Sequence, residues 1–350
     1  MVSEKSILVP VYFPDESHFY NEPVTVLAGD IGATKTNLAL YQFKNNEILI
    51  LQSRQYHSRS YNDINVILEE FLKGIRKVDR ISLGVAGPVI NGAANITNLN
   101  WKIDSDIISE KTRVKQVSVI NDLEAFAYGL AGIKPADIST IYSGDKNSSG
   151  NMCVIAPGSG LGEAGLYWDG QNYHPFATEG GHTSFSPECE TDIELYNYLK
   201  QKFGHVSWER VISGPGIITI YYFLRDIKKR KEPHWLNQKL SHGDQASVIS
   251  LFASGKQCPI CEETMNMFFR YLAAESANLV LKLKATGGIY IGGGIIPKVR
   301  YLIDRDEFVG HFLATGRMKT LLKKVPVKII LNDRTALAGA AYYGAYAITG

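Results

Sequence analysis

Residues 24–43, VTVLAGDIGATKTNLALYQF, decide the fold, because two apolar runs are separated there by a short stretch of small and polar residues. We expect strands over 24–28 and 38–43, since both runs are apolar and are bounded by turn-forming residues. A third run, 48–52, follows the pair Asn45-Asn46 and continues these strands as a meander. The chain therefore opens its regular structure with a sheet.

The stretch between the first two strands is GDIGAT, which consists of Gly29, Asp30, Ile31, Gly32, Ala33 and Thr34. Small residues let backbone N–H groups approach an anion, and Thr34 adds a hydroxyl donor. Asp30, at the end of a strand, is placed to hold Mg²⁺ through water. The stretch is neither a Walker A loop nor a GxGxxG that opens a helix. A tight hairpin turn explains it equally well.

Further along the chain, strands and helices alternate. Ile64, Ile67, Phe71, Ile75 and Val78 recur at helical spacing. Strands are expected over 80–86, 117–120, 152–155, 165–168, 289–291 and 325–331, and helices over 123–130, 192–203, 215–228, 262–284 and 335–348. This order indicates an α/β protein with a mixed sheet, and the polar loop 145–150 is a candidate domain boundary.

Two more glycine-rich loops follow strands. The first contains Gly158, Ser159 and Gly160 and ends at Gly162; so many glycines between two strands favour a phosphate cradle over a bulge. The second contains Gly292, Gly293 and Gly294, after the strand 289–291. It would let a flat ring lie on the backbone, and close helix–strand packing explains it equally well.

Asn121 and Asp122 stand at the end of the strand 117–120, just before a helix. Open α/β sheets bind ligands at that edge. An aspartate there could accept a proton from a hydroxyl nucleophile, as in phosphoryl transfer. Capping of the helix 123–130 is an equally good reading of Asp122.

A second polar set suits the binding of a sugar. Glu179, His182 and Glu209 are acceptors for sugar hydroxyl groups, and Asn98, in TNLNW, is a residue of the same kind.

Composition excludes several classes of protein. The 350 residues suggest two domains, and 37 Lys and Arg against 35 Asp and Glu give a net charge of +2, which provides no electrostatic case for a nucleic-acid partner. The most apolar run, 211–224, is too short for a membrane span. Residues 1–23 are expected to be an extension without signal-peptide character, so a cytoplasmic protein is expected. Cys258 and Cys261 are interpreted as a reduced pair opening a helix rather than as zinc ligands.

Seven motifs in order resemble the bacterial glucokinases of the ATP-dependent, non-zinc group, relatives of actin and hexokinase. They are GDIGAT (29–34), TNLNW (97–101), INDLEAF (120–126), GSGLG (158–162), EGGHTSFSP (179–187), GHVSWERVISGPG (204–216) and GGIYIGGGIIP (287–297). Ala33 departs from the glycine that is usual in the first loop of these relatives.

The resemblance implies a two-domain actin/hexokinase-like (ribonuclease-H-like) α/β fold with an interdomain cleft, with residues 24–132 and 333–350 in the small domain and 133–332 in the large one. It implies transfer of the γ-phosphoryl group of ATP to the 6-hydroxyl of glucose, with Mg²⁺, by a homodimer in glycolysis. Asp122 would be the catalytic base. The sugar would be bound by Asn98, Asn121, Asp122, Glu179, His182 and Glu209. ATP would be bound by residues 29–34, by Gly158, Ser159 and Gly160, and by Gly292, Gly293 and Gly294.

Two alternatives to a glucokinase remain. One is a kinase for another hexose or an amino sugar, because the motifs do not fix the sugar. The other is a non-catalytic sugar sensor, which would be expected to lack Asp30 or Asp122 or to carry an N-terminal DNA-binding helix pair. The zinc-bearing ROK relatives are disfavoured because their CxCGxxGC cluster is absent.

Overall fold

The computed structural model of the chain describes residues 8–14, 22–44, 47–96 and 99–347. They form two compact units. Unit 1 consists of Met1–Asp137, Ala164–Ala177 and Asn332–Gly350, and unit 2 of Ile138–Glu163 and Thr178–Leu331. The expected small domain did not include Ala164–Ala177, which the structure groups with unit 1.

Unit 1 is built on a five-stranded sheet in the order β3-β2-β1-β4-β8. Its strands are β1 (Val24–Ile31), β2 (Lys35–Lys44), β3 (Glu47–His57), β4 (Arg80–Val85) and β8 (Gln116–Asn121). The first three form the antiparallel meander expected from the sequence, whereas β1, β4 and β8 run parallel. A second, antiparallel sheet consists of β5 (Val89–Ile90), β6 (Ala93–Ile96) and β7 (Trp101–Asp104).

Helices cover both faces of the five-stranded sheet. They are α1 (Ile64–Leu72), α2 (Ser105–Thr112), α3 (Asp122–Gly129) and α12 (Thr335–Tyr346). Alternate residues of a strand point to opposite faces. Leu27 and Ile31 of β1 accordingly join the core with α1 and α2, while Val26 and Ala28 join the core with α12. Asp30 shares the parity of Val26 and Ala28, so its side chain is on the α12 face.

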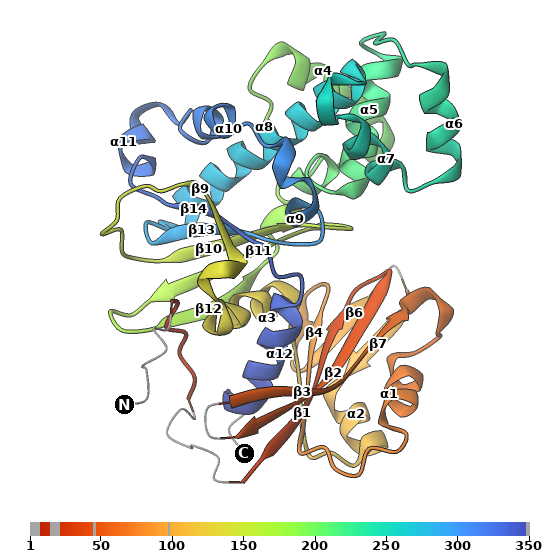
Figure 1. Cartoon of the computed structure of the whole chain (residues 1–350), viewed down its shortest axis with the longest axis vertical. Helices are drawn as coiled ribbons and strands as arrows, with labels where there is room; N and C mark the ends of the chain where they lie inside the picture. The colour runs from red at the N-terminus through yellow and green to blue at the C-terminus, as the bar shows by residue number, and fades with distance from the viewer. Residues whose placement is uncertain (1–7, 15–21, 45–46, 97–98, 348–350) are drawn as a thin grey trace. The chain divides into compact units, whose positions relative to one another are not determined.

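Glycines allow α12 and α3 to approach closely, and Figure 1 shows the two helices side by side. A Cβ at Gly339 would lie 1.7 Å from the backbone oxygen of Ala125, and one at Gly129 would lie 2.0 Å from that of Thr335. Only glycine fits at either position, so Gly129 of α3 and Gly339 of α12 allow this close approach.

The described part of the N-terminal extension packs on unit 1. Val11 forms a parallel bridge with Tyr173, and the Tyr12 N–H donates to the Tyr173 oxygen at 2.9 Å. The Phe13 ring lies 5.6 Å from the ring centres of both Tyr128 and Tyr346. Val9, Val11 and Phe13 are thereby buried, whereas Leu8 and Tyr12 are exposed.

We expect Phe13→Leu to lower the free energy of unfolding by about 1–2 kcal/mol, because the buried ring loses its aromatic contacts. Urea denaturation of the full chain measures this change. Tyr12→Phe is the matched control, since Tyr12 is 40% exposed and the change keeps its ring contact with His174, and it should change the stability by less than about 0.5 kcal/mol. Equal stability of the two variants would show that the Phe13 contacts contribute nothing.

A six-stranded mixed sheet, in the order β12-β11-β10-β13-β14-β9, has four of its strands, β9, β10, β13 and β14, wholly in unit 2. Its strands are β9 (Ile138–Tyr142), β10 (Met152–Pro157), β11 (Leu161–Trp168), β12 (Tyr173–Thr178), β13 (Gly288–Ile291) and β14 (Val327–Ile330). The outer part of the β11–β12 hairpin is the stretch grouped with unit 1.

The helices of unit 2 share one large apolar core with this sheet. They are α4 (Glu190–Phe203), α5 (Gly214–Asp226), α6 (His234–His242), α7 (Gln245–Phe252), α8 (Pro259–Leu283), α9 (Ile296–Val299), α10 (Arg305–Phe312) and α11 (Lys319–Leu322). The 3₁₀ turns of the chain are η1 (Ser58–Ser60), η2 (Leu130–Gly132), η3 (Pro135–Asp137), η4 (Gly180–His182), η5 (Trp208–Arg210), η6 (Ser254–Lys256), η7 (Arg300–Leu302) and η8 (Gly316–Met318).

The structure corrects three sequence-based expectations. The helix expected to include Val78 ends at Leu72, because Gly74 takes a left-handed conformation (φ 81°) that breaks it. The polar loop 145–150 joins β9 and β10 inside unit 2 and is not a domain boundary. Residues 29–31 continue strand β1, so only residues 32–34 form a turn. The expected turn at Asn45-Asn46 lies outside the described residues.

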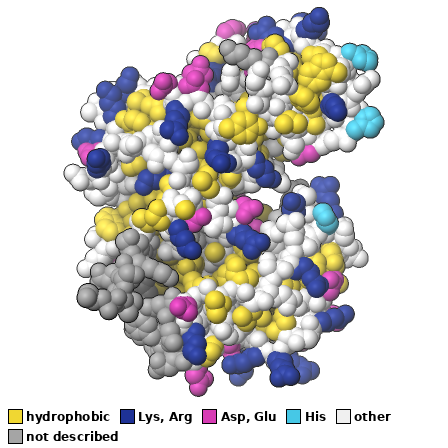
Figure 2. Space-filling model, in the orientation of Figure 1, with side chains coloured by type: hydrophobic (Ala, Val, Ile, Leu, Met, Phe, Trp, Pro, Cys, Tyr) yellow, Lys and Arg dark blue, Asp and Glu magenta, His cyan; other side chains and the backbone are white. Residues whose placement is uncertain are grey.

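The described surface agrees with the near-neutral composition. Figure 2 shows Lys and Arg side chains scattered over the visible face among acidic and hydrophobic ones. Within the described ranges, no helix combines the length and the apolar character needed to cross a bilayer.

Candidate active site

The parallel strands of unit 1 bring two aspartates to one edge of the sheet. In the register, Asp30 pairs with Gly84 and Val85 pairs with Asn121, so β1, β4 and β8 end together. Asp30 stands near the end of β1, and Asp122 directly follows β8 as the first residue of α3. Because only β4 separates β1 from β8, the two strand ends lie about 10 Å apart.

Asp30 lines a cavity on the α12 side of the sheet. One carboxylate oxygen, Oδ2, accepts from Asn37 Nδ2 at 3.1 Å, and burial raises the pKa of the Asp30 carboxyl, an effect that this hydrogen bond opposes. The cavity has a volume of about 280 Å³. Its lining residues are Asp30, Asn37, Ser53, Arg54, Gln55, Asp333, Arg334 and Leu337. Arg334 was not expected here, because no local sequence pattern places it beside a residue some 300 positions earlier.

The first glycine-rich stretch makes a tight β1–β2 turn. The Gly32 N–H donates to the Lys35 oxygen at 2.9 Å. Ser58, from η1, holds the turn from outside: its hydroxyl donates to the Gly32 oxygen at 2.7 Å, and its N–H donates to the Thr34 oxygen at 3.1 Å. The hairpin reading is therefore correct for residues 32–34, and it is compatible with anion binding by the same turn.

Asn121, and not Asp122, is the N-cap of α3. Asn121 Oδ1 accepts from the N–H groups of Leu123 and Glu124 at 2.9 and 3.2 Å, while its Nδ2 donates to the Gly87 oxygen at 3.1 Å. The Asn121 side chain is buried and largely occupied by these bonds. Asp122 is partly exposed and accepts from the Leu123 N–H at 2.9 Å through Oδ1. The helix cap that the sequence also allowed for Asp122 is therefore provided by Asn121.

In unit 2, the second and third glycine-rich loops lie side by side. The Gly292 N–H donates to the Ile155 oxygen at 2.9 Å, and a Cβ at Gly293 would lie 2.4 Å from the Pro157 oxygen. Gly293 also has a φ of 82°, which a larger side chain rarely adopts. The Gly214 N–H, at the start of α5, donates to the Gly158 oxygen at 2.9 Å.

The segments of unit 2 that carry Glu179, His182 and Glu209 meet at the start of β11. The segments that carry Glu179 and Glu209 are joined by the bond from the Trp208 N–H to the Thr183 oxygen, at 3.1 Å. Glu209 Oε2 accepts from the Leu161 N–H at 3.0 Å. His182 Nε2 lies 3.9 Å from Glu179 Oε2, and both side chains are about half exposed. Asn98 lies outside the described residues.

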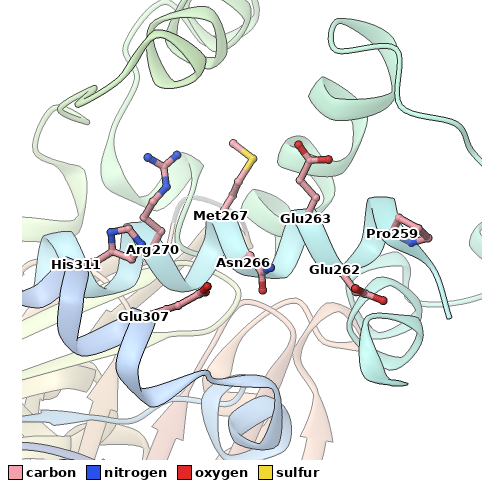
Figure 3. Close-up of a pocket in the computed structure, with 8 residues that line it drawn as sticks. All are labelled: Pro259, Glu262, Glu263, Asn266, Met267, Arg270, Glu307 and His311. Carbon is pink, nitrogen blue, oxygen red and sulfur yellow. The ribbon is translucent and has the colours of Figure 1, made fainter. Parts of the chain in front are cut away.

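Two other features have no place in this set. The first is a cavity of about 350 Å³ on unit 2, between α8 and α10, which Figure 3 shows. Two of its lining residues are held in ion pairs: Arg270 with the buried Asp192 at 3.1 Å, and Glu263 with Arg230 at 2.7 Å. Cys258 and Cys261 are buried free thiols at the start of α8. Among the described residues, no three His, Cys, Asp or Glu are grouped to hold a metal ion.

Comparison with known proteins defines the family. The family model named Glucokinase matches residues 27–347. A glucokinase of Trichormus variabilis is 36% identical over 333 residues, which cover 90% of this chain and 97% of the relative. The crystal structure of a glucokinase from an Antarctic psychrotroph has a TM-score of 0.75 at 30% identity, and the match covers 92% of this chain and 98% of that one.

The crystal structure of a glucokinase from Balamuthia mandrillaris in complex with glucose has a TM-score of 0.77 at 20% identity. The match covers 93% of this chain and 94% of that one, and it shows a likeness of fold alone. The fold and these relatives define an ATP-dependent hexose kinase of the actin-like hexokinase fold, which confirms the predicted fold class. The chain belongs to the glucokinase family.

Proposed function

We propose that the chain transfers the γ-phosphoryl group of ATP to the 6-hydroxyl of glucose, giving glucose 6-phosphate and ADP. The observation that supports this most is the shared edge of β1, β4 and β8, which presents Asp30 at the end of β1 and Asp122 just after β8, with only β4 between the two strands. Phosphoryl transfer needs one carboxylate near the phosphates and another at the nucleophile. We assign Asp30 to the first role and Asp122 to the second.

Asp122 is the proposed base. It is partly exposed at the first turn of α3, where the partial positive charge of the helix N-terminus favours the carboxylate. Its Oδ1 is held by the Leu123 N–H, which orients the other oxygen. In this role Asp122 accepts the proton of the 6-hydroxyl and positions the oxygen for attack.

Asp30 is the proposed contact, through water, for the magnesium ion that accompanies ATP. Magnesium bound to the phosphates would neutralise charge that develops during transfer. The donor chemistry fits, because Mg²⁺ prefers carboxylate oxygens. The hydrogen bond from Asn37 goes to Asp30 Oδ2 and not to Oδ1. The turn 32–34 is assigned to phosphate, as is the turn 158–160, and Gly292–Gly294 to the adenosine.

The residues assigned to the sugar hydroxyl groups, as the family resemblance implies, are Asn98, Asn121, Asp122, Glu179, His182 and Glu209. Ionised carboxylates only accept hydrogen bonds, so each glutamate requires a hydroxyl donor at a defined position. A cytoplasmic location, a homodimer and a role in glycolysis are also proposed, on the family resemblance alone.

We expect glucose to be preferred over galactose and N-acetylglucosamine by at least about tenfold in kcat/KM, because an epimer or a bulky substituent leaves a carboxylate without its donor. ADP formation with ATP and Mg²⁺ against a panel of hexoses measures this preference and tests the proposed function. Turnover of another hexose or amino sugar in preference to glucose would assign a different substrate. No ADP formation with any hexose would contradict the function itself.

A further inference from the structure

Glu163 is a buried carboxyl group that the proposed reaction does not use. It follows the second glycine-rich loop, on strand β11, and its side chain is only 1% exposed. Neither of its carboxyl oxygens accepts a hydrogen bond from a donor among the described residues. A buried carboxylate without donors is strongly disfavoured, so an explanation of this group has to come from its neighbours.

A second carboxyl, Glu275 of α8, acts on Glu163 electrostatically and is fully buried. Glu275 accepts from Lys282 Nζ and from Asn278 Nδ2, both at 2.9 Å. The cluster therefore holds two carboxyls and one cation, and that cation is already paired with Glu275. Cys153 of β10 is the remaining titratable neighbour, and its thiol is also fully buried. One proton on Glu163 would balance the charges and let its carboxyl donate to Glu275.

Glu163 also supports the segment that starts at Glu179. Its backbone oxygen accepts from Thr178 Oγ1 at 3.0 Å, and the same Thr178 oxygen accepts from the Gly180 N–H at 3.2 Å. The carboxyl lies against Gly180 so closely that a Cβ there would be 1.9 Å from Glu163 Oε2. The position of the carboxyl and the position of residues 179–182 are thus coupled by direct contact.

We propose that Glu163 is a positioning residue for the segment 179–182, and that its carboxyl must carry a proton shared with Glu275 to hold that segment in place. The proposal rests on the proposed function, in which Glu179 and His182 of this segment bind the sugar. Glu163 acts through the segment and makes no contact with the reaction itself.

The protonation state predicts a pH dependence. Burial, together with the Glu275 carboxylate, raises the pKa of Glu163 to about 8, and Lys282 only partly offsets this. Below that pH the carboxyl is neutral and donates to Glu275. Above it, two carboxylates face one cation in a buried site, and their repulsion displaces Glu163 against Gly180. Sugar binding should therefore weaken as the pH rises through about 8.

The test measures two constants from about pH 6.5 to about pH 9.5, a range that spans this transition. They are the KM for glucose and the dissociation constant for glucose without ATP, the latter by calorimetry. We expect both constants of the wild type to rise at least about threefold across it, with a smaller change in kcat. Glu163→Gln remains neutral and still donates to Glu275, so it should keep the low-pH constants and remove the rise. Glu262→Gln is the control, because Glu262 lies on α8 about 20 Å from Glu275 along the helix axis. This variant should keep the wild-type profile.

Glu275→Gln gives a second measurement that does not depend on the folding of Glu163→Gln. It removes the repelling carboxylate and leaves Lys282 available to an ionised Glu163, so the rise should be lost. Circular dichroism checks that the variants are folded. Wild-type constants that do not change with pH, or an unchanged rise in Glu163→Gln, would overturn the proposal. Absence of glucose binding at every pH, together with absence of turnover of any hexose, would instead refute the proposed function.

Discussion

Asp122→Asn is expected to lower kcat by about 10²–10⁴-fold, which corresponds to about 3–5 kcal/mol of transition-state stabilisation. The reason is that an amide cannot accept the proton of the attacking hydroxyl at neutral pH. The local fold should survive, because Asn keeps the oxygen that accepts from the Leu123 N–H at 2.9 Å, and because the N-cap of α3 is Asn121. KM for glucose should change much less than kcat.

Steady-state kinetics of the purified variant, with circular dichroism to confirm its fold, measures this effect. Asp106→Asn is the matched control, because Asp106 is an exposed aspartate in the first turn of another helix, α2. It should leave kcat within about twofold, as surface substitutions away from a site usually do. If Asp122→Asn turned over glucose as fast as the control, Asp122 would not be the base.

Glu209→Gln is expected to lower kcat/KM for glucose by about 10–100-fold, since a buried or half-buried charged hydrogen bond contributes about 1.5–3 kcal/mol. One carboxylate oxygen is already committed to the Leu161 N–H at 3.0 Å. Gln must present its own oxygen to this donor, which leaves an NH₂ group where the sugar needs an acceptor. The preference for glucose over galactose should fall as well.

The same hexose panel measures this prediction, with Glu190→Gln as the control. Glu190 is an exposed glutamate at the start of α4 in the same unit, so its variant should retain the wild-type kcat/KM and sugar preference. An unchanged ratio of glucose to galactose in Glu209→Gln would show that Glu209 serves only to hold the turn at Leu161.

Much of the fold could be predicted because it depends on short-range pattern. Apolar runs and turn residues predicted the meander of β1, β2 and β3, and the helices expected from the sequence match α3, α5, α8 and α12 to within a few residues. The sheet β5-β6-β7 was missed, since its strands have only two to four residues and carry no sustained alternation. The helix α1 was extended too far because Ile75 and Val78 continue the spacing after Gly74 has ended the helix.

The candidate site divides in the same way. Asp30 and Asp122 could be found from the sequence because each stands at or just after the end of a largely buried strand, and the ends of parallel strands share one edge. The choice between Asn121 and Asp122 as the cap could not be made, since the two are adjacent. The structure shows that Asn121 Oδ1 accepts from the N–H groups of Leu123 and Glu124, while its Nδ2 donates to the distant Gly87 oxygen.

What the sequence by itself determined is the set of local elements and the residues at their ends, because periodicity and turn chemistry act over a few positions. Only the tertiary structure decided which distant groups meet: Glu209 with Leu161, Arg334 with the cavity of Asp30, and Glu163 with Glu275. Such contacts depend on which apolar faces are buried against one another. The protonation of a group such as Glu163 follows from that burial and from its neighbours, so it has no signature in the chain around it.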